Sequence, residues 1–244
     1  MKHALFEDTT EVRMIAHRGF TPLAPENSLP AFEAACRLGF WAVESDVRET
    51  RDGALVCCHN PDTGGNFNDT LSIAESTLSE LRRLRFVSGN RVDLLEEDAR
   101  RVPTFEEYLT VCRKYDAVPF LECKTPVAGK IVDVLRRYGM LEHTVFSSTE
   151  FPFLAEARKA APEIFLHHIF TTHGEMEELA HLGNSGVSWN CPDPAAPEVP
   201  ERIAAAKHSG VRVCLRAADT PERLRLMREM KLDYIPTNTL IPGK

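Results

Sequence analysis

Short apolar runs alternate with helix-like segments along almost the whole chain, and this alternation limits the possible folds more than any other feature. Nine runs of three to seven residues have the length and apolar composition of buried strands. They cover residues 12–16, 41–47, 54–58, 118–123, 144–147, 164–168, 186–190, 211–215 and 233–235. Alternating β and α units predict a parallel sheet with right-handed crossovers.

Between these runs, apolar residues recur at helical spacing. Ile131, Val134, Leu135 and Tyr138 are one example. Thr104 is followed three residues later by Glu107, the pattern of a capping box, and Thr220 stands before a proline at a first helical position. The predicted helices cover residues 29–38, 104–115, 127–138, 152–160, 174–182, 200–209 and 221–230.

The number and spacing of the strands favour a barrel over an open, doubly wound sheet. Residues 50–53 (Thr-Arg-Asp-Gly) resemble a hairpin turn, so the run at 54–58 is expected to pair with the second strand and leave eight strands for the barrel. The length of 244 residues is close to the about 250 residues of a (β/α)8 TIM barrel. We therefore expect one α/β domain over 1–244, with an insertion at about 61–102 after the second barrel strand.

Composition excludes several classes of protein. With 29 basic and 36 acidic residues, the net charge of −7 argues against a general nucleic-acid binder. No apolar run approaches the roughly 20 residues of a membrane span, and residues 1–8 lack the apolar core of a signal peptide. The seven cysteines are scattered among apolar neighbours, which predicts reduced thiols and a cytoplasmic protein. The sequence does not indicate an oligomeric state.

Polar residues gather where the predicted strands end. The carboxyl ends of barrel strands share one rim, which is where barrel enzymes carry their active sites. Residues two apart in a strand also share a face. The polar side chains at these ends are His17 and Arg18, Glu44 and Asp46, His59, and Glu122 and Lys124.

These residue types suit the cleavage of a phosphate ester. Carboxylates clustered without cysteine suit one hard divalent cation, Mg²⁺ or Ca²⁺. Arginine and lysine suit a phosphate, and two imidazoles can serve as general acid and general base. Each residue also has a purely structural alternative; Glu122 and Lys124, for example, can simply pair with each other.

In these residues the sequence resembles the glycerophosphodiester phosphodiesterase family. The resemblance covers roughly the first 150 residues. In order, the matching segments are His17-Arg18-Gly19, Pro25-Glu26-Asn27-Ser28, Glu44-x-Asp46, the apolar run into His59, Glu122-x-Lys124 and, more weakly, Val145-Phe146-Ser147-Ser148.

The resemblance implies an α/β barrel that hydrolyses a small glycerophosphodiester to an alcohol and glycerol 3-phosphate. It implies that one divalent metal ion is held by Glu44, Asp46 and Glu122. It further implies that His17 and His59 are the catalytic acid and base. Arg18 and Lys124 would contact the phosphate, while Glu26 and Asn27 would support these groups or cap a helix.

Three positions depart from the family pattern. Asn60 follows the second histidine in place of aspartate, and Asn238 follows Thr237 where the family usually has Thr-Asp. On the penultimate strand, residues 214–217 (Cys-Leu-Arg-Ala) stand where the family usually has Trp-Thr-x-Asn. We expect Arg216 to contact the substrate and to favour an anionic head group. Of His167 and His168, one must face into the barrel and the other the helices, and the inward-facing one is a candidate to line the pocket.

Two other functions remain open at this point. A phospholipase-D-like lyase of the same superfamily would act on lysolipid or sphingolipid head groups and release a cyclic phosphate. A non-catalytic barrel could keep the pocket only to bind a ligand. The pair of histidines favours an enzyme, because a binding protein needs no acid and base.

Overall fold

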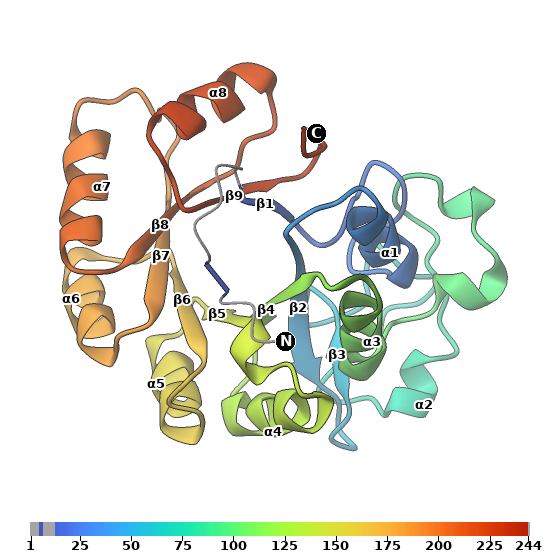
Figure 1. Ribbon diagram of the computed structural model, residues 1–244. Helices are drawn as coiled ribbons and strands as arrows, with labels where there is room; N and C mark the ends of the chain where they lie inside the picture. The colour runs from blue at the N-terminus through green and yellow to red at the C-terminus, as the bar shows by residue number, and fades with distance from the viewer. Residues whose placement is uncertain (1–4, 7–12, 244) are drawn as a thin grey trace.

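The computed structural model describes residues 5–6 and 13–243, and it shows a ring of parallel strands enclosed by helices (Figure 1). The strands are β1 (Arg13–Ala16), β2 (Ala42–Glu49), β3 (Leu55–Cys57), β4 (Val118–Cys123), β5 (Val145–Ser148), β6 (Phe165–Ile169), β7 (Ser185–Asn190), β8 (Arg212–Arg216) and β9 (Tyr234–Thr237). Within the described residues, every end of a strand lies within two residues of its prediction; Val12, predicted to begin the first strand, lies outside them.

Eight strands form the predicted barrel. They pair in the order β8-β7-β6-β5-β4-β2-β1-β9, and all of these pairs are parallel. Backbone hydrogen bonds link the segments around β8 and β9, from the Asp233 N–H to the Val213 oxygen (3.0 Å) and from the Ala218 N–H to the Pro236 oxygen (2.8 Å). These contacts bring the two edges of the sheet together, so the fold is a TIM barrel and not an open doubly wound sheet.

The ninth strand is the predicted hairpin partner. β3 runs antiparallel to β2, with Val47 opposite Cys57. Gly53 adopts a positive φ of 81° in the turn between them, a conformation that glycine adopts without steric cost.

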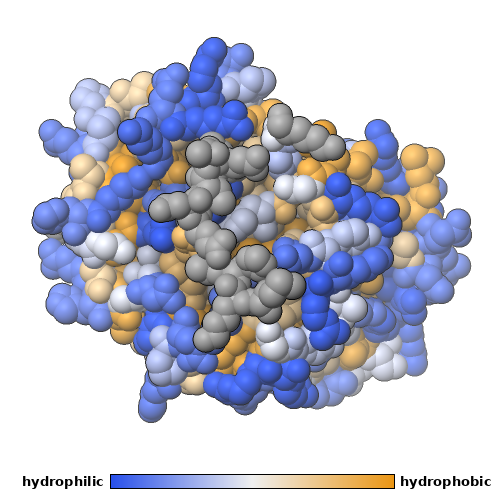
Figure 2. Space-filling view, viewed as in Figure 1, coloured by the Kyte–Doolittle hydropathy of each residue, from blue (hydrophilic) through white to orange (hydrophobic). Residues whose placement is uncertain are grey.

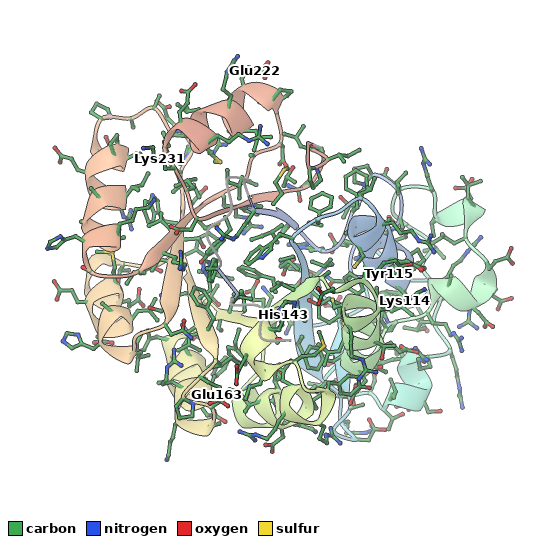
Figure 3. The ribbon with its side chains drawn as sticks, in the orientation of Figure 1. Lys114, Tyr115, His143, Glu163, Glu222 and Lys231 are labelled. Carbon is green, nitrogen blue, oxygen red and sulfur yellow. The ribbon has the colours of Figure 1, made fainter. Side chains whose placement is uncertain are left out.

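The barrel helices lie outside the strands, as βα crossovers require. They are α1 (Leu29–Arg37), α3 (Phe105–Tyr115), α4 (Ala128–Tyr138), α5 (Phe151–Ala160), α6 (His173–Leu182), α7 (Glu198–His208) and α8 (Pro221–Glu229), with the 3₁₀ turn η3 at Leu141–His143. The capping box at Thr104 is present, and the Ser28 hydroxyl caps α1 by accepting from the Ala31 N–H. Neighbouring helices are also tied by side chains: at the end of α3, Lys114 and Tyr115 (Figure 3) both donate to Glu33 of α1.

Residues 61–102 form a small unit of their own beside the barrel. It contains α2 (Leu78–Leu81) and the 3₁₀ turns η1 (Val92–Leu94) and η2 (Glu97–Arg100). The sequence favours a helix near 78–84, but α2 ends at Leu81, three residues earlier, where the chain turns back to the core of this unit. Asn90 donates to the Thr21 oxygen, and a Cβ on Gly89 would lie 2.8 Å from Pro25 Cα. The insertion is therefore packed tightly against the loop after β1.

Aromatic rings fill the amino end of the barrel. Trp41, Phe165 and Tyr234 stand at the beginnings of β2, β6 and β9, and the Phe6 ring lies 4.7–5.7 Å from theirs. The Arg212 guanidinium lies 4.1 Å over the Phe6 ring. This end of the barrel is thus closed by stacked aromatic side chains.

Hydrophilic side chains dominate the outer edge of the molecule, where the helices face outward (Figure 2). Over the described residues, no helix combines the length and the apolar character needed to cross a bilayer. All seven cysteines are buried free thiols, as the sequence predicted.

Candidate active site

Three buried carboxylates meet at the carboxyl ends of β2 and β4. Asp46 is the register partner of Glu122 on the neighbouring strand, and Glu44 lies two residues earlier on the same face as Asp46. Ligand oxygens of all three lie within 4.8 Å of one another. The alternation predicted from the sequence therefore produces one cluster and not a solvent-facing row.

Cations border this acidic cluster. Lys124 Nζ lies 2.5 Å from Glu122 Oε1 and 3.2 Å from Asp46 Oδ1. The geometry at Asp46 does not make a hydrogen bond, so its buried Oδ1 has no hydrogen-bond donor. The Arg18 guanidinium pairs with Glu26 at 2.9 Å, and its Nε lies 3.7 Å from Asp46 Oδ2.

The backbone of the loop after β1 donates a hydrogen bond to the cluster. Arg18 has a positive φ of 59°, and its N–H donates to Glu44 Oε2 at 2.7 Å. A Cβ on Gly19 would lie 2.7 Å from Ala31 of α1, so only glycine fits there. The His17-Arg18-Gly19 motif thus joins the strand to the helix and supplies a hydrogen-bond donor to a carboxylate.

Asn27 connects the same loop to β2. Its Nδ2 donates to Asp46 Oδ2 at 2.8 Å, and its Oδ1 accepts from the Ser45 hydroxyl and the Asp46 N–H. Asn27 therefore orients Asp46 and leaves the other carboxylate oxygen, Oδ1, facing the cluster.

The electrostatics of the cluster favour a bound cation. Burial, and then the charges of Asp46 and Glu122, raise the pKa of Glu44 well above its usual value. Burial and the charge of Asp46 also raise the pKa of Glu122. At Asp46 burial acts in the same direction, but Lys124 and Arg18 outweigh it and lower the pKa. Three oxygen donors, mutual repulsion and an oxygen without a donor fit a hard divalent cation.

His17 stands at the mouth of the barrel beside this cluster. Its Nδ1 lies 2.8 Å from Asn238 Oδ1, and its Nε2 lies 3.3 Å from Arg216 Nη2. Burial, followed by the positive charge of Arg18, lowers the pKa of His17 to about 4. The imidazole is therefore neutral near neutral pH.

His59 follows the hairpin strand and is half-buried. Its Nδ1 lies 2.9 Å from Asn60 Oδ1, so Asn60 provides a neutral partner at the position where the family usually has aspartate. Arg48 fixes the local backbone through Nη2, which donates to the His59 oxygen at 2.7 Å. His59 also helps to lower the pKa values of Asp46 and Glu122, so it lies within electrostatic range of the acidic cluster, although it lines neither of the two cavities described below.

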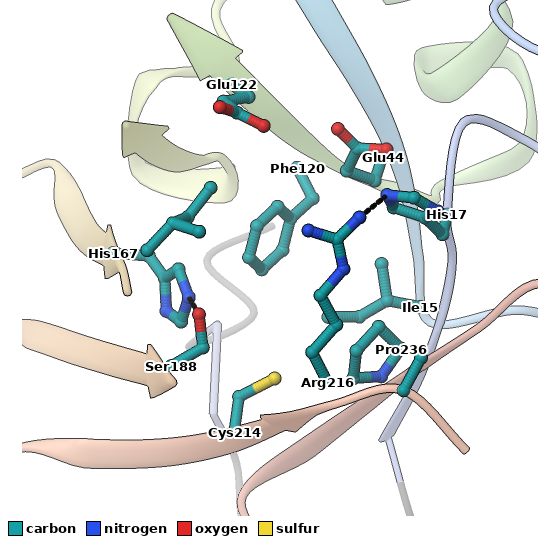
Figure 4. A pocket seen from close by; sticks show the side chains of 12 residues that line it. Ile15, His17, Glu44, Phe120, Glu122, His167, Ser188, Cys214, Arg216 and Pro236 are labelled. Atoms are coloured by element: carbon teal, nitrogen blue, oxygen red, sulfur yellow. Dashed lines mark hydrogen bonds between the residues drawn. The ribbon is translucent and has the colours of Figure 1, made fainter. Parts of the chain in front are cut away.

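Two cavities open at this end of the barrel, and His17 and Arg216 line both. The inner chamber (Figure 4) has a volume of about 60 Å³ and reaches from Glu44 and Glu122 to the apolar interior. The outer cleft, of about 620 Å³, lies between the loop after β1 and the insertion. His167 faces the inner chamber, as one member of the predicted histidine pair had to.

Further side-chain hydrogen bonds hold residues in and around these two cavities. His167 lies 2.6 Å from the Tyr234 hydroxyl and 3.0 Å from Ser188 Oγ (Figure 4 shows the latter contact). Asp219, in the loop after β8, holds Asn238 through its side chain and backbone. Asp219 was not among the predicted site residues, although the strand-end rule applied to β8 would have selected it, and Asn238 was noted only as a departure from the family pattern.

A parallel barrel with acidic, imidazole and cationic side chains at its carboxyl end has the architecture of a barrel enzyme for an anionic substrate. The model of the glycerophosphoryl diester phosphodiesterase family matches residues 17–241. A glycerophosphodiester phosphodiesterase of Caldanaerobacter subterraneus is 25% identical over 232 residues, covering 92% of this chain and 93% of the relative.

Solved structures agree. A protein of Silicibacter pomeroyi assigned as a glycerophosphoryl diester phosphodiesterase superposes with a TM-score of 0.80 at 25% identity, covering 97% of this chain and 93% of the other. An Oleispira antarctica phosphodiesterase in complex with sn-glycerol-3-phosphate gives a TM-score of 0.79 at 23% identity, covering 93% of each chain. The chain belongs to the glycerophosphoryl diester phosphodiesterase family, and it is a phosphoric diester hydrolase.

Proposed function

We propose that this protein hydrolyses a glycerophosphodiester to an alcohol and glycerol 3-phosphate, with one divalent metal ion and two catalytic histidines. The observation that carries the proposal is the buried triad of Glu44, Asp46 and Glu122 directly beside His17. The related Oleispira protein was solved with sn-glycerol-3-phosphate, the product this reaction would form.

Glu44, Asp46 and Glu122 would hold the metal, Mg²⁺ or Ca²⁺, through carboxylate oxygens. When bound, such an ion supplies charge neutralisation and Lewis acidity at the diester. Asn27 keeps Asp46 oriented, and Glu26 holds the Arg18 guanidinium at the mouth of the site. In this proposal, Asn27 and Glu26 position the side chains that bind the metal and the phosphate, and neither contacts the substrate itself.

Arg18 and Lys124 would contact the phosphate. Both are partly buried against the acidic cluster, and Arg18 also lines the outer cleft, so they offer positive charge where water is scarce. Their carboxylate partners keep them in place before the substrate arrives. They supply local positive charge for an anionic substrate on a molecule whose net charge is −7.

His17 and His59 would move the protons. One histidine takes the proton of the attacking oxygen, from water or a substrate hydroxyl, and the other protonates the departing alcohol oxygen as the P–O bond breaks. They come from different elements, His17 after β1 and His59 after β3, and each interacts electrostatically with Asp46. This arrangement allows an acid and a base on one phosphate.

Arg216 would set the preference for the head group. It lines both cavities, and its guanidinium lies 5.8 Å from the Phe170 ring at the rim. A cation at this point favours a diester whose alcohol half carries negative charge. The substrate is a small molecule in this proposal, and the whole of 1–244 acts as one domain that works in the cytoplasm.

An activity screen that varies both metal and substrate tests the proposal. The metal-stripped protein should be inactive and should regain turnover with Mg²⁺ or Ca²⁺ on at least one glycerophosphodiester, releasing glycerol 3-phosphate. A cyclic phosphate product would indicate the lyase instead. A folded, metal-replete protein that is inert towards a broad panel of diesters would indicate a ligand-binding barrel.

A further inference from the structure

We infer that Asp219 and Asn238 are positioning residues that hold His17 in one tautomer, with the proton on Nδ1 and the Nε2 lone pair facing the chamber. The inference rests on the proposed catalytic role of His17, and it specifies which histidine accepts a proton and which donates one. His17 becomes the proton acceptor, and His59 the proton donor.

The orientation of the Asn238 amide follows from its partner. Asn238 Nδ2 lies 2.7 Å from Asp219 Oδ2, and the Asn238 backbone N–H donates to Asp219 Oδ1 at 2.7 Å. An ionised carboxylate only accepts, so the NH₂ group must face Asp219. The amide oxygen therefore faces His17, where Oδ1 lies 2.8 Å from Nδ1. An amide oxygen only accepts, so Nδ1 must carry the proton.

The opposite side of the imidazole requires the same tautomer. Arg216 Nη2 lies 3.3 Å from His17 Nε2, and a guanidinium only donates. Nε2 must therefore be the acceptor. Two partners from different elements, one after β9 and one on β8, impose the same proton position independently.

Asp219 is itself fixed by the closure of the barrel. The Thr237 hydroxyl donates to Asp219 Oδ1 at 3.3 Å, and the Thr239 hydroxyl donates to the Asp219 backbone oxygen at 3.0 Å. The adjacent Ala218 N–H donates to the Pro236 oxygen at 2.8 Å. The network thus extends from the β8–β9 junction to the imidazole.

The fixed tautomer determines the direction of proton transfer. Nε2 accepts the proton of the attacking O–H as the new O–P bond forms, and His59 supplies a proton to the alcohol oxygen as the old P–O bond breaks. Before this step Arg216 must leave Nε2, and the phosphate oxygens of the substrate are the better acceptors for its guanidinium. Afterwards His17 carries the extra charge, and solvent returns one proton to His59 and removes one from His17.

Kinetics on a series of variants test the network. Asn238→Ala should lower kcat by about 10- to 100-fold, with KM and metal affinity unchanged. Asn238→Asp should be similarly slow, because it places two carboxylates 2.7 Å apart. Adding Asp219→Asn to Asn238→Asp should restore kcat to within about 10-fold, because the side-chain hydrogen bond between 219 and 238 then persists with its direction reversed, while the side chain at 238 still accepts from His17 Nδ1. Asn68→Ala, an exposed asparagine in the insertion, is the matched control.

Nitrogen-15 NMR of the histidines reads the tautomer directly and does not depend on activity. Comparison with His17→Gln assigns the His17 signals, which should show protonated Nδ1 and bare Nε2 in the wild type and a mixture of tautomers in Asn238→Ala. A wild-type Nε2–H tautomer, or unchanged kcat in Asn238→Ala, would overturn the inference. Absence of turnover on every diester with the expected tautomer would count against the proposed function alone.

Discussion

The same strands form both ends of this barrel, but apolar side chains pack at the amino end while charged side chains gather at the carboxyl end. On β4, Phe120 contributes to the apolar interior, while Glu122, two residues later on the same face, belongs to the acidic cluster. On β8 the same step leads from buried Cys214 to Arg216 at the mouth. On each of these strands, a buried side chain of the interior is followed by a charged side chain of the candidate site about 7 Å further on, which is the rise of two residues.

The energetics of the two ends differ in the same way. At the amino end, ring contacts around Phe6 remove apolar surface from water. At the carboxyl end, three buried carboxylates repel each other, and Asp46 Oδ1 lacks a donor. The amino end therefore contributes apolar packing, whereas the carboxyl end carries buried charges that a bound cation would balance.

The histidine variants should have the largest effect and should separate activity from stability. His17→Ala and His59→Ala are each expected to lower kcat by about 10² to 10⁴, the usual contribution of one proton transfer. Thermal unfolding should be unchanged within a few degrees. His208→Ala, on the exposed end of α7, is the control. Near-normal turnover in a folded variant would remove that histidine from the mechanism.

A change at the amino end should do the reverse. Phe6→Ala should reduce the free energy of unfolding by about 2 kcal/mol, less than for a fully buried phenylalanine, because Phe6 is half-buried. Metal-saturated kcat at a temperature where the variant is folded should not change. Denaturant unfolding and initial rates measure the two effects, with exposed Leu94→Ala as control. A loss of kcat without a loss of stability would show that the two ends are coupled.

Glu44→Gln should stabilise the metal-free protein while abolishing the stabilisation that metal brings. Burial and the charges of Asp46 and Glu122 raise the pKa of Glu44, so the folded state prefers its protonated form. Wild-type stability is therefore lost as pH rises through this raised pKa, and glutamine avoids that loss. The variant should gain about 1 kcal/mol or more at neutral pH and little at pH 4.

The pKa values of His17 (about 4) and His167 (about 3) are lowered, so they change the stability of the protein in the opposite direction with pH. The folded state favours both histidines in their neutral form, and this contribution to stability is lost as pH falls below about 6.5. Both histidines are common to the wild type and Glu44→Gln, so the difference between the two proteins isolates Glu44. Exposed Glu178→Gln is the control. A variant less stable than the wild type at neutral pH without metal would contradict the assigned repulsion.

The smallest effect should be on substrate preference. Arg216→Ala should lower kcat/KM for a diester with an anionic head group, such as glycerophosphoserine, by up to about 10-fold more than for glycerophosphocholine. The ratio of the kcat/KM values for the two substrates removes any effect that the contact of Arg216 with His17 has on both of them. Equal losses on both substrates would show that Arg216 does not read the head group.

Local pattern was enough to predict the elements and most of the site. Apolar runs and helix caps placed the strands and helices within two residues, and the two-residue period placed Glu44 with Asp46. The short end of α2 was not predicted, because it depends on how the insertion packs on itself. The contacts of Arg216 and Asn238 with His17 were also not predicted, since these residues are 199 and 221 positions away from His17 in the chain.

The sequence by itself therefore determined the alternating elements, the strand ends that carry charge and the residue types of a metal and phosphate site. Only the tertiary structure decided how those groups are held. Closure of the barrel brings β9 beside β1, and it is this closure that places Asn238 on the His17 imidazole and Arg216 on its other side. Contacts of this kind depend on the register of the whole sheet, which no local pattern contains.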